Sequence, residues 1–372
     1  MSFSDEIKSK ALELGFDLVG ITDAGAIGSE QVEILRSWLE SDFAGRMGFM
    51  QRNFDKRVNP SKLLDNAQSV VVAGLNYNPP EKVRFDRTLH GHIASYALYE
   101  DYHTFIKKRL RELADFIVTY NAQNEQWIPA SAGMTERDTT YDQRVTSYEP
   151  RVTAKICVDS VPLAERALAV RAGLGFIGKN HMLINPRLGC KIFLGEIITD
   201  LKLDYDEPIS EGRVQCIAPK ESYREVKSAM LSPPTCLSCD MCVKACPTGA
   251  LRSDGLFDAS RCINYLTIEY KGEIPPELAE KIGDKVFGCE DCIDICPYQK
   301  NVPACQNKQF KFYPERAQVN LEKVLTLNEE AFEEKFCNTA IQRPGLDVLK
   351  RNARICLGNS QSAGKPVKRT SS

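Results

Sequence analysis

Hydrophobic positions in the first part of the chain recur with a helical period in some segments and form short β-branched runs in others. In residues 29–42, Val32, Leu35 and Leu39 fall on one face of a helix. Residues 68–75 (QSVVVAGL) are typical of a buried strand. Strands that alternate with helices up to residue 200 indicate a layered α/β or α+β domain. The same patterns predict further helices over about 4–15, 94–120 and 162–172, and further strands over 17–22, 155–158 and 191–199.

Two polar segments, residues 122–150 and 208–233, break this pattern. We expect both to be surface insertions, because long segments without regular structure are usually peripheral or functional. We also expect roughly the last ten residues to be disordered.

Composition and charge exclude several classes of protein. The chain has 372 residues, 43% of them hydrophobic, which suggests about two to three domains of roughly 150 residues each. Its net charge of −2 gives no overall basic field of the kind that marks a nucleic-acid binder. No apolar run approaches about 18 residues, so we expect no membrane span. The N-terminal MSFSDEIKSK is charged where a signal peptide is apolar, so we expect a cytoplasmic protein.

Cysteine is the unusual component, with 14 cysteines against 4 histidines. Structural disulfides are rare in a reducing cytosol, which favours metal binding or redox chemistry. Residues 236–247 (CLSCDMCVKACP) have the C-x2-C-x2-C-x3-C-P spacing of bacterial [4Fe–4S] ferredoxins. Residues 289–297 repeat this spacing with one cysteine fewer, and Cys262 lies between the two runs and can supply the missing ligand.

In such ferredoxins the cysteine of the C-P end binds the other cluster, and this rule divides the ligands between two [4Fe–4S] clusters. It assigns Cys236, Cys239, Cys242 and Cys296 to cluster one, and Cys246, Cys262, Cys289 and Cys292 to cluster two. The alternative is a pair of zinc ribbons, which use C-x2-C pairs about 15–20 residues apart. The remaining cysteines are expected to be small buried hydrophobic residues: Cys157, Cys190, Cys216, Cys305, Cys337 and Cys356.

Two further motifs are less specific. Residues 173–178 (GLGFIG) match G-x-G-x-x-G, but a helical pattern precedes them and no helix can start after them, which disfavours a nucleotide site. We expect these glycines to let the backbone approach a bulky ligand closely. Asp101-Tyr102-His103 is a D-x-H that lacks the glycine completing the histidine-on cobalamin signature. The alternative is an aspartate at a helix start beside a surface histidine.

The chain resembles the epoxyqueuosine reductase family. The resemblance is carried by KICVDSVPLAERALAVRAGLGFIGKN, CLSCDMCVKACPTGAL and GCEDCIDICPYQ, with NPSKLLDNAQSVVVAGLNY near the front and AIQRPGLDVLKRNARICLGNS near the end. It implies a cobalamin held base-off in the N-terminal domain, two [4Fe–4S] clusters and tRNA as the substrate. The implied reaction removes the epoxide oxygen of epoxyqueuosine at the wobble position and gives queuosine.

The resemblance also implies roles for single residues. Asp159 matches the family's proton donor, a task that requires a pKa well above about 3.9; the alternative is a helix cap. Arg57 resembles a position that contacts cobalamin, and the alternative is a solvated basic loop. The residues expected to line the corrin pocket or the substrate base are Tyr102, His103, Lys179, Asn180 and His181. The alternative for each of them is a structural role.

A tRNA substrate needs positive surface in spite of the net charge. Residues 341–372, with seven basic residues against Asp347, and residues 107–111 offer two patches for phosphate contacts. Phe310, Phe312 and Tyr313 could stack on bases or belong to the core. Nothing in the sequence demands more than a monomer, and an electron donor protein or other reductant is required.

These patterns together predict an α+β protein in three parts. Residues 1–229 are expected to form a mixed α/β cobalamin-binding catalytic domain, residues 230–305 a two-cluster ferredoxin-like domain, and residues 306–372 a short helical region. Two alternatives remain: another cobalamin and iron–sulfur reductase, such as a reductive dehalogenase, or a ferredoxin-type electron-transfer protein.

Overall fold

The computed structural model describes residues 2–80, 89–124, 152–209 and 236–363. The predicted insertions at 122–150 and 208–233 lie outside these residues except at their edges, as do Cys216 and nearly all of the predicted tail. Within the described ranges, no helix is long and apolar enough to cross a membrane.

A four-stranded sheet forms the centre of the N-terminal part. Its order is β1 (Leu18–Asp23), β2 (Ser69–Asn76), β7 (Ile192–Thr199) and β4 (Ala154–Cys157), and all neighbours are antiparallel. Every residue of β2 and β7 is buried. Burial on both faces explains why QSVVVAGL is a continuous apolar run rather than an alternating one.

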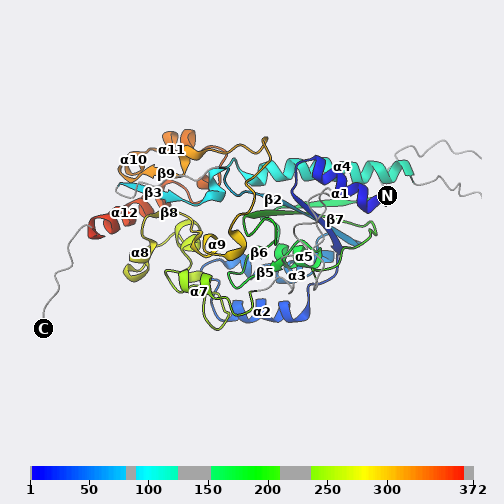
Figure 1. The fold of residues 1–372 in the computed structure, drawn as a ribbon, viewed down its shortest axis with the longest axis horizontal. Helices are drawn as coiled ribbons and strands as arrows, with labels where there is room; N and C mark the ends of the chain where they lie inside the picture. The colour runs from blue at the N-terminus through cyan, green and yellow to red at the C-terminus, as the bar shows by residue number, and fades with distance from the viewer. Residues whose placement is uncertain (1, 81–88, 125–151, 210–235, 364–372) are drawn as a thin grey trace, which may run out of the picture.

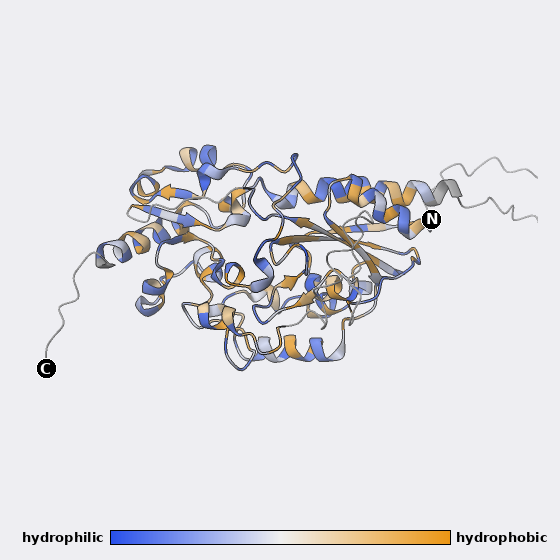
Figure 2. Cartoon of the chain, viewed as in Figure 1, coloured by the Kyte–Doolittle hydropathy of each residue, from blue (hydrophilic) through white to orange (hydrophobic). Residues whose placement is uncertain are grey.

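Helices cover both faces of this sheet, which gives three layers (Figure 1). On one face lie α1 (Phe3–Glu13) and α4 (Tyr102–Asn124), where Leu110 packs in the same core as Val71 of β2. On the other face lie α2 (Ser29–Glu40), α3 (Phe54–Val58) and α5 (Glu165–Arg171), where Leu168 shares a core with Val72. The hydrophobic colour concentrates along the central strands, between the two helical layers (Figure 2).

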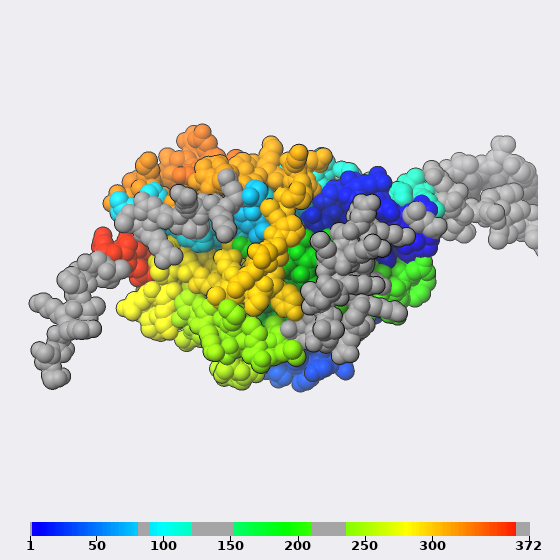
Figure 3. Space-filling model, viewed as in Figure 1, coloured from blue at the N-terminus to red at the C-terminus, as the bar shows by residue number. Residues whose placement is uncertain are grey.

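The second half is organised around a smaller sheet of order β8 (Lys285–Phe287), β3 (His90–Ile93) and β9 (Gln318–Asn320). β3 runs parallel to β8 and antiparallel to β9. The yellow and orange segments of this half lie directly against the green and blue segments of the first half (Figure 3).

Short elements complete the described part of the chain. The α-helices of the second half are α7 (Met241–Ala245), α8 (Pro276–Ile282), α9 (Asp291–Asp294), α10 (Leu321–Thr326), α11 (Glu329–Phe336) and α12 (Leu346–Ala363). A two-stranded hairpin consists of β5 (Phe176–Ile177) and β6 (Leu183–Ile184). The 3-10 helices are η1 (Gly48–Met50), η2 (Pro60–Lys62), η3 (Ser95–Leu98), η5 (Ala259–Arg261), η7 (Pro297–Gln299), η8 (Pro314–Arg316) and η9 (Ala340–Gln342), and η6 (Tyr265–Glu269) is a π-helix.

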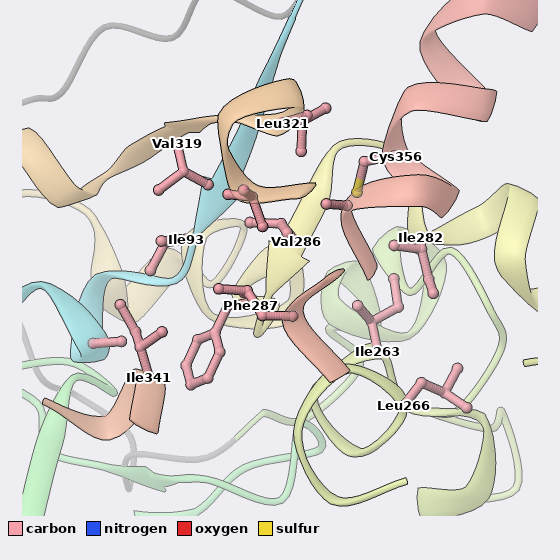
Figure 4. Packing of buried hydrophobic residues seen from close by; sticks show 14 of the residues in the cluster. Ile93, Ile263, Leu266, Ile282, Val286, Phe287, Val319, Leu321, Ile341 and Cys356 are labelled. Carbon is pink, nitrogen blue, oxygen red and sulfur yellow. The ribbon is translucent and has the colours of Figure 1, made fainter. Parts of the chain in front are cut away.

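One hydrophobic core joins the cysteine-rich segment to the C-terminal helices. Ile93 of β3, Ile263, Phe287 of β8, Leu321 and Cys356 of α12 belong to it (Figure 4). The side chains come from segments far apart in the sequence, so the C-terminal helices pack on the same core as the cysteine-rich segment. The division into ranges 1–229, 230–305 and 306–372 stays a prediction.

The α+β fold predicted from the sequence is confirmed, with two local differences. The predicted helix over 94–120 is split into η3 and α4, because the Asp101 side chain accepts a hydrogen bond from the His103 N–H (2.8 Å) and begins a new helix. The expectation for the non-ligand cysteines is wrong at Cys337, which is exposed, and Cys305 is half-buried. Cys157, Cys190 and Cys356 are buried as expected.

The sheet core generates a stability prediction. Ile197 of β7 is fully buried, so Ile197→Ala leaves a cavity and should lower the free energy of unfolding by about 2–5 kcal/mol. Ile34 is 58% exposed, so Ile34→Ala is the matched control with little effect. Urea unfolding followed by circular dichroism measures both. Equal shifts in the two variants would contradict the placement of β7 between two helical layers.

Candidate active site and cysteine loops

Two short helices shape the cysteine loops. α7 and α9 contact each other, and each is followed within two residues by a Cys-Pro pair. Cys246 and Cys296 have extended backbone, because a residue before proline is disfavoured in the helical region. Both cysteines therefore leave the helix that precedes them, as binding to the opposite cluster requires.

The thiols of the cysteine loops act on one another electrostatically. The pKa of Cys242 is raised by burial and by Cys236 and Cys296. The pKa of Cys292 is raised by burial and then by Cys262, Cys289, Cys246 and Cys242. These neighbours include Cys296 for the first predicted ligand set and Cys262 for the second, but Cys242 of the first set is also a neighbour of Cys292 of the second. The ligand assignment itself stays a prediction.

A cavity of about 780 Å³ joins the two halves of the molecule. This volume lies within the usual range of ligand sites. Asp159, His103 and Arg343 line it together with the thiols of the predicted cluster two: Cys246, Cys262, Cys289 and Cys292. The thiols of the predicted cluster one do not line it.

Asp159 is the centre of a hydrogen-bonded group in this cavity. Its Oδ2 accepts from the Tyr102 hydroxyl (3.1 Å) and lies 3.1 Å from His103 Nε2 and 3.5 Å from Arg343 Nη1. The other His103 ring nitrogen, Nδ1, lies 2.8 Å from Asp101 Oδ1. A histidine between two carboxylates is held in its protonated form.

The proton at this site therefore belongs to His103. Burial favours neutral His103, but hydrogen bonds with Asp101 and Asp159 outweigh it and raise the pKa to about 9. The hydrogen bond with His103 lowers the pKa of Asp159, and the positive charges of His103 and Arg343 add to this effect. The expectation of a raised pKa for Asp159 is wrong in this structure, because its charged neighbours outweigh its burial.

Two further carboxyl groups lie near Asp159. Glu165 Oε1 accepts from the Asp159 N–H (2.7 Å), and burial together with the Asp159 charge raises the Glu165 pKa to about 7. Glu196 on β7 is fully buried, and neither of its oxygens has a partner among the described residues. Burial, and then Glu165 and Asp159, raise the pKa of Glu196 well above its ordinary value.

Sequence reasoning missed Glu165, Glu196 and Arg343 as site residues. Glu165 follows Asp159 by six positions and lies within the quoted KICVDSVPLAER segment, so that signal was present. Arg343 was counted with the basic tail, but it forms an ion pair with Glu269 (2.9 Å) besides its contact with Asp159. Only the fold brings Arg343 to a residue so far away in the sequence.

The other predicted site residues lie in three places, of which only the first is the cavity. Tyr102, His103, Asn180 and His181 line the cavity. Lys179 does not; its N–H donates to Cys236 Sγ (3.4 Å) and its Nζ to the Leu237 carbonyl (2.8 Å). Arg57 donates from Nη2 to the Phe49 carbonyl (3.3 Å), and its buried Nε has no partner among the described residues.

Comparisons with known proteins agree with this arrangement. Residues 235–299 match the family model of a 4Fe–4S double cluster binding domain, and residues 57–135 match that of epoxyqueuosine reductase QueG. The epoxyqueuosine reductase of Leadbetterella byssophila is 35% identical over 350 residues, covering 94% of this chain and 97% of that protein. A crystal structure of epoxyqueuosine reductase with an epoxyqueuosine-modified tRNA-Tyr stem loop is 28% identical with a TM-score of 0.77, covering 97% of this chain and 82% of that one.

A second solved structure has the same degree of similarity. It is the epoxyqueuosine reductase of Bacillus subtilis with a catalytic aspartate loop swung out of the active site, 27% identical with a TM-score of 0.77. It covers 97% of this chain and 82% of that one.

The fold and the cysteine loops define a reductase of the double [4Fe–4S] cluster class. More particularly, the chain belongs to the epoxyqueuosine reductase family. The resemblance seen in the sequence is thus confirmed, and the double-cluster model favours iron–sulfur over zinc ribbons. The dehalogenase and electron-carrier alternatives are not retained, because the relatives that match most of the chain are epoxyqueuosine reductases.

The proton on His103 generates a pH prediction. The folded pKa of about 9 exceeds the ordinary 6.5, so protonation stabilises the fold fully below pH 6.5. This contribution is lost as the pH rises through about 9. In Asp159→Asn the His103 pKa should fall toward 6.5, since one of its two carboxylate partners is gone. Histidine NMR titration of the apoprotein measures the shift, with the exposed Asp115→Asn as a control. An unchanged His103 pKa in Asp159→Asn would rule out this ion pair.

Proposed function

We propose that this chain reduces epoxyqueuosine to queuosine at the wobble position of tRNA, with a base-off cobalamin and two [4Fe–4S] clusters as cofactors. One observation carries the proposal: Asp159 with its protonated partner His103 shares a single cavity with the cysteines of cluster two. The family supplies the substrate, because a relative is solved with an epoxyqueuosine-modified tRNA stem loop.

The residues present fit both cofactors. The pKa values of Cys242 and Cys292 are raised by burial and by neighbouring cysteines, and such close thiols are suited to iron–sulfur clusters because thiolates are the ligands that these clusters use. Arg57 offers a buried Nε without a partner among the described residues, beside the charges of Glu165 and Asp159. When bound, cobalamin supplies the reducing chemistry at cobalt, and the clusters supply electrons one at a time.

The protein's own task is to supply protons. Conversion of an epoxide to an alkene and water consumes two electrons and two protons. Asp159 is 43% exposed toward the cavity, and His103 Nε2 lies 3.1 Å from its Oδ2. We assign His103 as the group that holds the proton and Asp159 as the group that relays it from His103 to the epoxide oxygen. The Bacillus subtilis relative, with its catalytic aspartate loop, supports this assignment.

Further residues complete the proposed pocket. Tyr102, Asn180 and His181 line the cavity and are proposed to contact the corrin or the substrate base, and Arg57 a part of the cobalamin. Lys179 is proposed to contact the loop of cluster one instead, because both of its hydrogen bonds go to that loop.

The proposed tRNA surface is smaller than the basic patches of the sequence. Arg109 and Arg351 donate to backbone carbonyls, so neither is free for a phosphate, and Arg343 belongs to the active site. Exposed Lys108, Arg111 and Arg354 remain for phosphate contacts. Phe310 stacks on Tyr99 in the core and cannot stack on a base. Phe312 packs on Tyr99 as well.

The remaining assignments extend the same proposal. The chain would act as a cytoplasmic monomer that receives electrons from a donor protein or another reductant. Residues 1–229 would hold cobalamin and the catalytic group, residues 230–305 the clusters, and residues 306–372 the helical cover of the cluster core.

The proton role of Asp159 is tested by Asp159→Asn in protein reconstituted anaerobically with iron, sulfide and cobalamin. We expect both chromophores to be retained and turnover of epoxyqueuosine-containing tRNA to fall by at least about 10²-fold, the usual contribution of general acid catalysis. Asp115→Asn, on the exposed face of α4, should keep full activity. Nucleoside analysis of the tRNA measures the product, and wild-type rates in Asp159→Asn would remove this residue from the mechanism.

The division of the ligands is tested by Cys262→Ser. Loss of one ligand of cluster two should remove about four of roughly eight irons and leave cluster one in place. The exposed Cys337→Ser is the matched control and should keep all the iron. Iron analysis with EPR spectroscopy measures both. Full iron occupancy in Cys262→Ser would mean that the ligand sets are drawn wrongly.

A further inference from the structure

The segment of residues 338–344, between α11 and α12, forms part of the cavity wall. Its backbone is fastened near both ends. The Asn338 carbonyl accepts from the Asp101 N–H (2.7 Å), which directly precedes α4. The Pro344 carbonyl accepts from Lys271 Nζ (2.6 Å). The residues of this segment that line the cavity are Thr339, Ala340, Gln342 and Arg343.

Arg343 of this segment reaches two carboxyl groups that come from different halves of the molecule. Its Nη1 lies 3.5 Å from Asp159 Oδ2, and its Nε lies 2.9 Å from Glu269 Oε1. Glu269 is the last residue of η6, which follows Cys262 in the chain. A guanidinium presents several donors in fixed directions, so a single arginine can hold two carboxylates at once. Arg343 therefore bridges the Asp159 loop and the segment that carries a predicted ligand of cluster two.

Arg343 and His103 approach the same oxygen of Asp159. His103 Nε2 lies 3.1 Å from Oδ2, to which Arg343 Nη1 also donates. Two cations at one carboxylate oxygen share its negative charge, so Arg343 weakens the attraction of Asp159 for the proton on His103. Without Arg343, the two carboxylates of Asp101 and Asp159 would bind that proton more tightly.

We propose that Arg343 is a positioning residue that binds the Asp159 carboxylate in competition with His103 and so keeps the stored proton available for transfer. This rests on the proposed function, in which Asp159 relays that proton to the substrate. The proton leaves His103, which becomes neutral, and Asp159 is a carboxylate before and after the relay. Arg343 keeps its charge throughout and neither gains nor loses a proton.

Other charged and titratable groups also act on this pair. A change at Arg343 leaves their side chains in place, so the direction of the response reports the charge of Arg343 itself. Around Asp159 and His103 these groups are Asp101, Tyr102 of α4, Arg57 of α3, Glu165 and Arg166 of α5, and Glu196 of β7, and Tyr96 and Glu269 act on Arg343.

The test uses variants at both ends of the bridge. Arg343→Gln removes the positive charge, and Arg343→Lys keeps it. Glu269→Gln leaves Arg343 in place without its second carboxylate. Arg36→Gln is the matched control, because Arg36 lies on α2 in an exposed ion pair with Glu33. Histidine NMR titration of the full chain follows His103, and single-turnover assays of the reconstituted enzyme follow the product as a function of pH.

In Arg343→Gln the pKa of His103 should rise by about one pH unit from its value of about 9, because a positive neighbour of Asp159 is gone. Turnover at neutral pH should fall about tenfold, and the alkaline limb of the pH–rate profile should move to higher pH with the His103 pKa. Arg343→Lys should stay near the wild type. Glu269→Gln should lower the His103 pKa, and Arg36→Gln should change neither quantity.

An unchanged or lower His103 pKa in Arg343→Gln would overturn the proposal, because loss of a purely structural contact would loosen the ion pair with Asp159. Equal effects of Gln and Lys would do the same. So would weaker binding of the tRNA stem loop at unchanged turnover, which would assign Arg343 to substrate binding. If Arg343→Gln fails to fold, Glu269→Gln decides, and a His103 pKa that does not fall there contradicts the bridge. Wild-type enzyme that shows these His103 responses but forms no queuosine would instead overturn the proposed function.

Discussion

The structure depends on keeping many potentially negative groups together around one cavity. The carboxyl groups of Asp159 and Glu165 and the four cysteine thiols face the same space, and Glu196 lies behind them in the sheet. Burial and mutual repulsion raise the pKa of Glu196 well above its ordinary value and that of Glu165 to about 7. Of these three carboxyl groups, only Asp159 has a lowered pKa, because His103 and Arg343 both reach its Oδ2. The charged carboxylate of Asp159 therefore lies beside the proton that His103 holds.

A second buried ion pair fastens the cluster-two loop to the central sheet. Lys191 Nζ lies 3.6 Å from Glu290 and 2.9 Å from Asp294, and the Ser95 N–H donates to Glu290 (2.6 Å). Lys191 directly precedes β7, and Glu290 lies between two of the predicted ligands. A buried pair of this kind adds little net stability, but loss of one partner is costly. It therefore fixes the position of the cysteines relative to the sheet that carries the acid group.

Local sequence patterns were sufficient to predict the central sheet and the cysteine loops. The apolar run of β2 and the spacing of the cysteines depend only on near neighbours in the sequence, and both were predicted. The roles of Arg343 and Arg109 depend on contacts with residues about two hundred positions away, so charge counts placed them on the surface. The predicted direction of the Asp159 pKa was wrong for the same reason, since the prediction assumed burial, whereas Asp159 is 43% exposed and its charged partners lower the pKa.

The orientation of Asp159 follows from its backbone rather than from its side-chain partners alone. Its φ of +49° lies in the left-handed region, which aspartate tolerates better than most residues, and the Glu165 carboxyl accepts its N–H. A carboxyl oxygen remains an acceptor whether or not the group is protonated. The loop geometry can therefore persist while Glu165 titrates near pH 7, and only the charge that Asp159 experiences changes. A neutral Glu165 makes Asp159 a weaker base, and a charged Glu165 makes it a stronger one. Glu165 is thus placed to adjust the proposed proton transfer between His103 and Asp159 without moving either group.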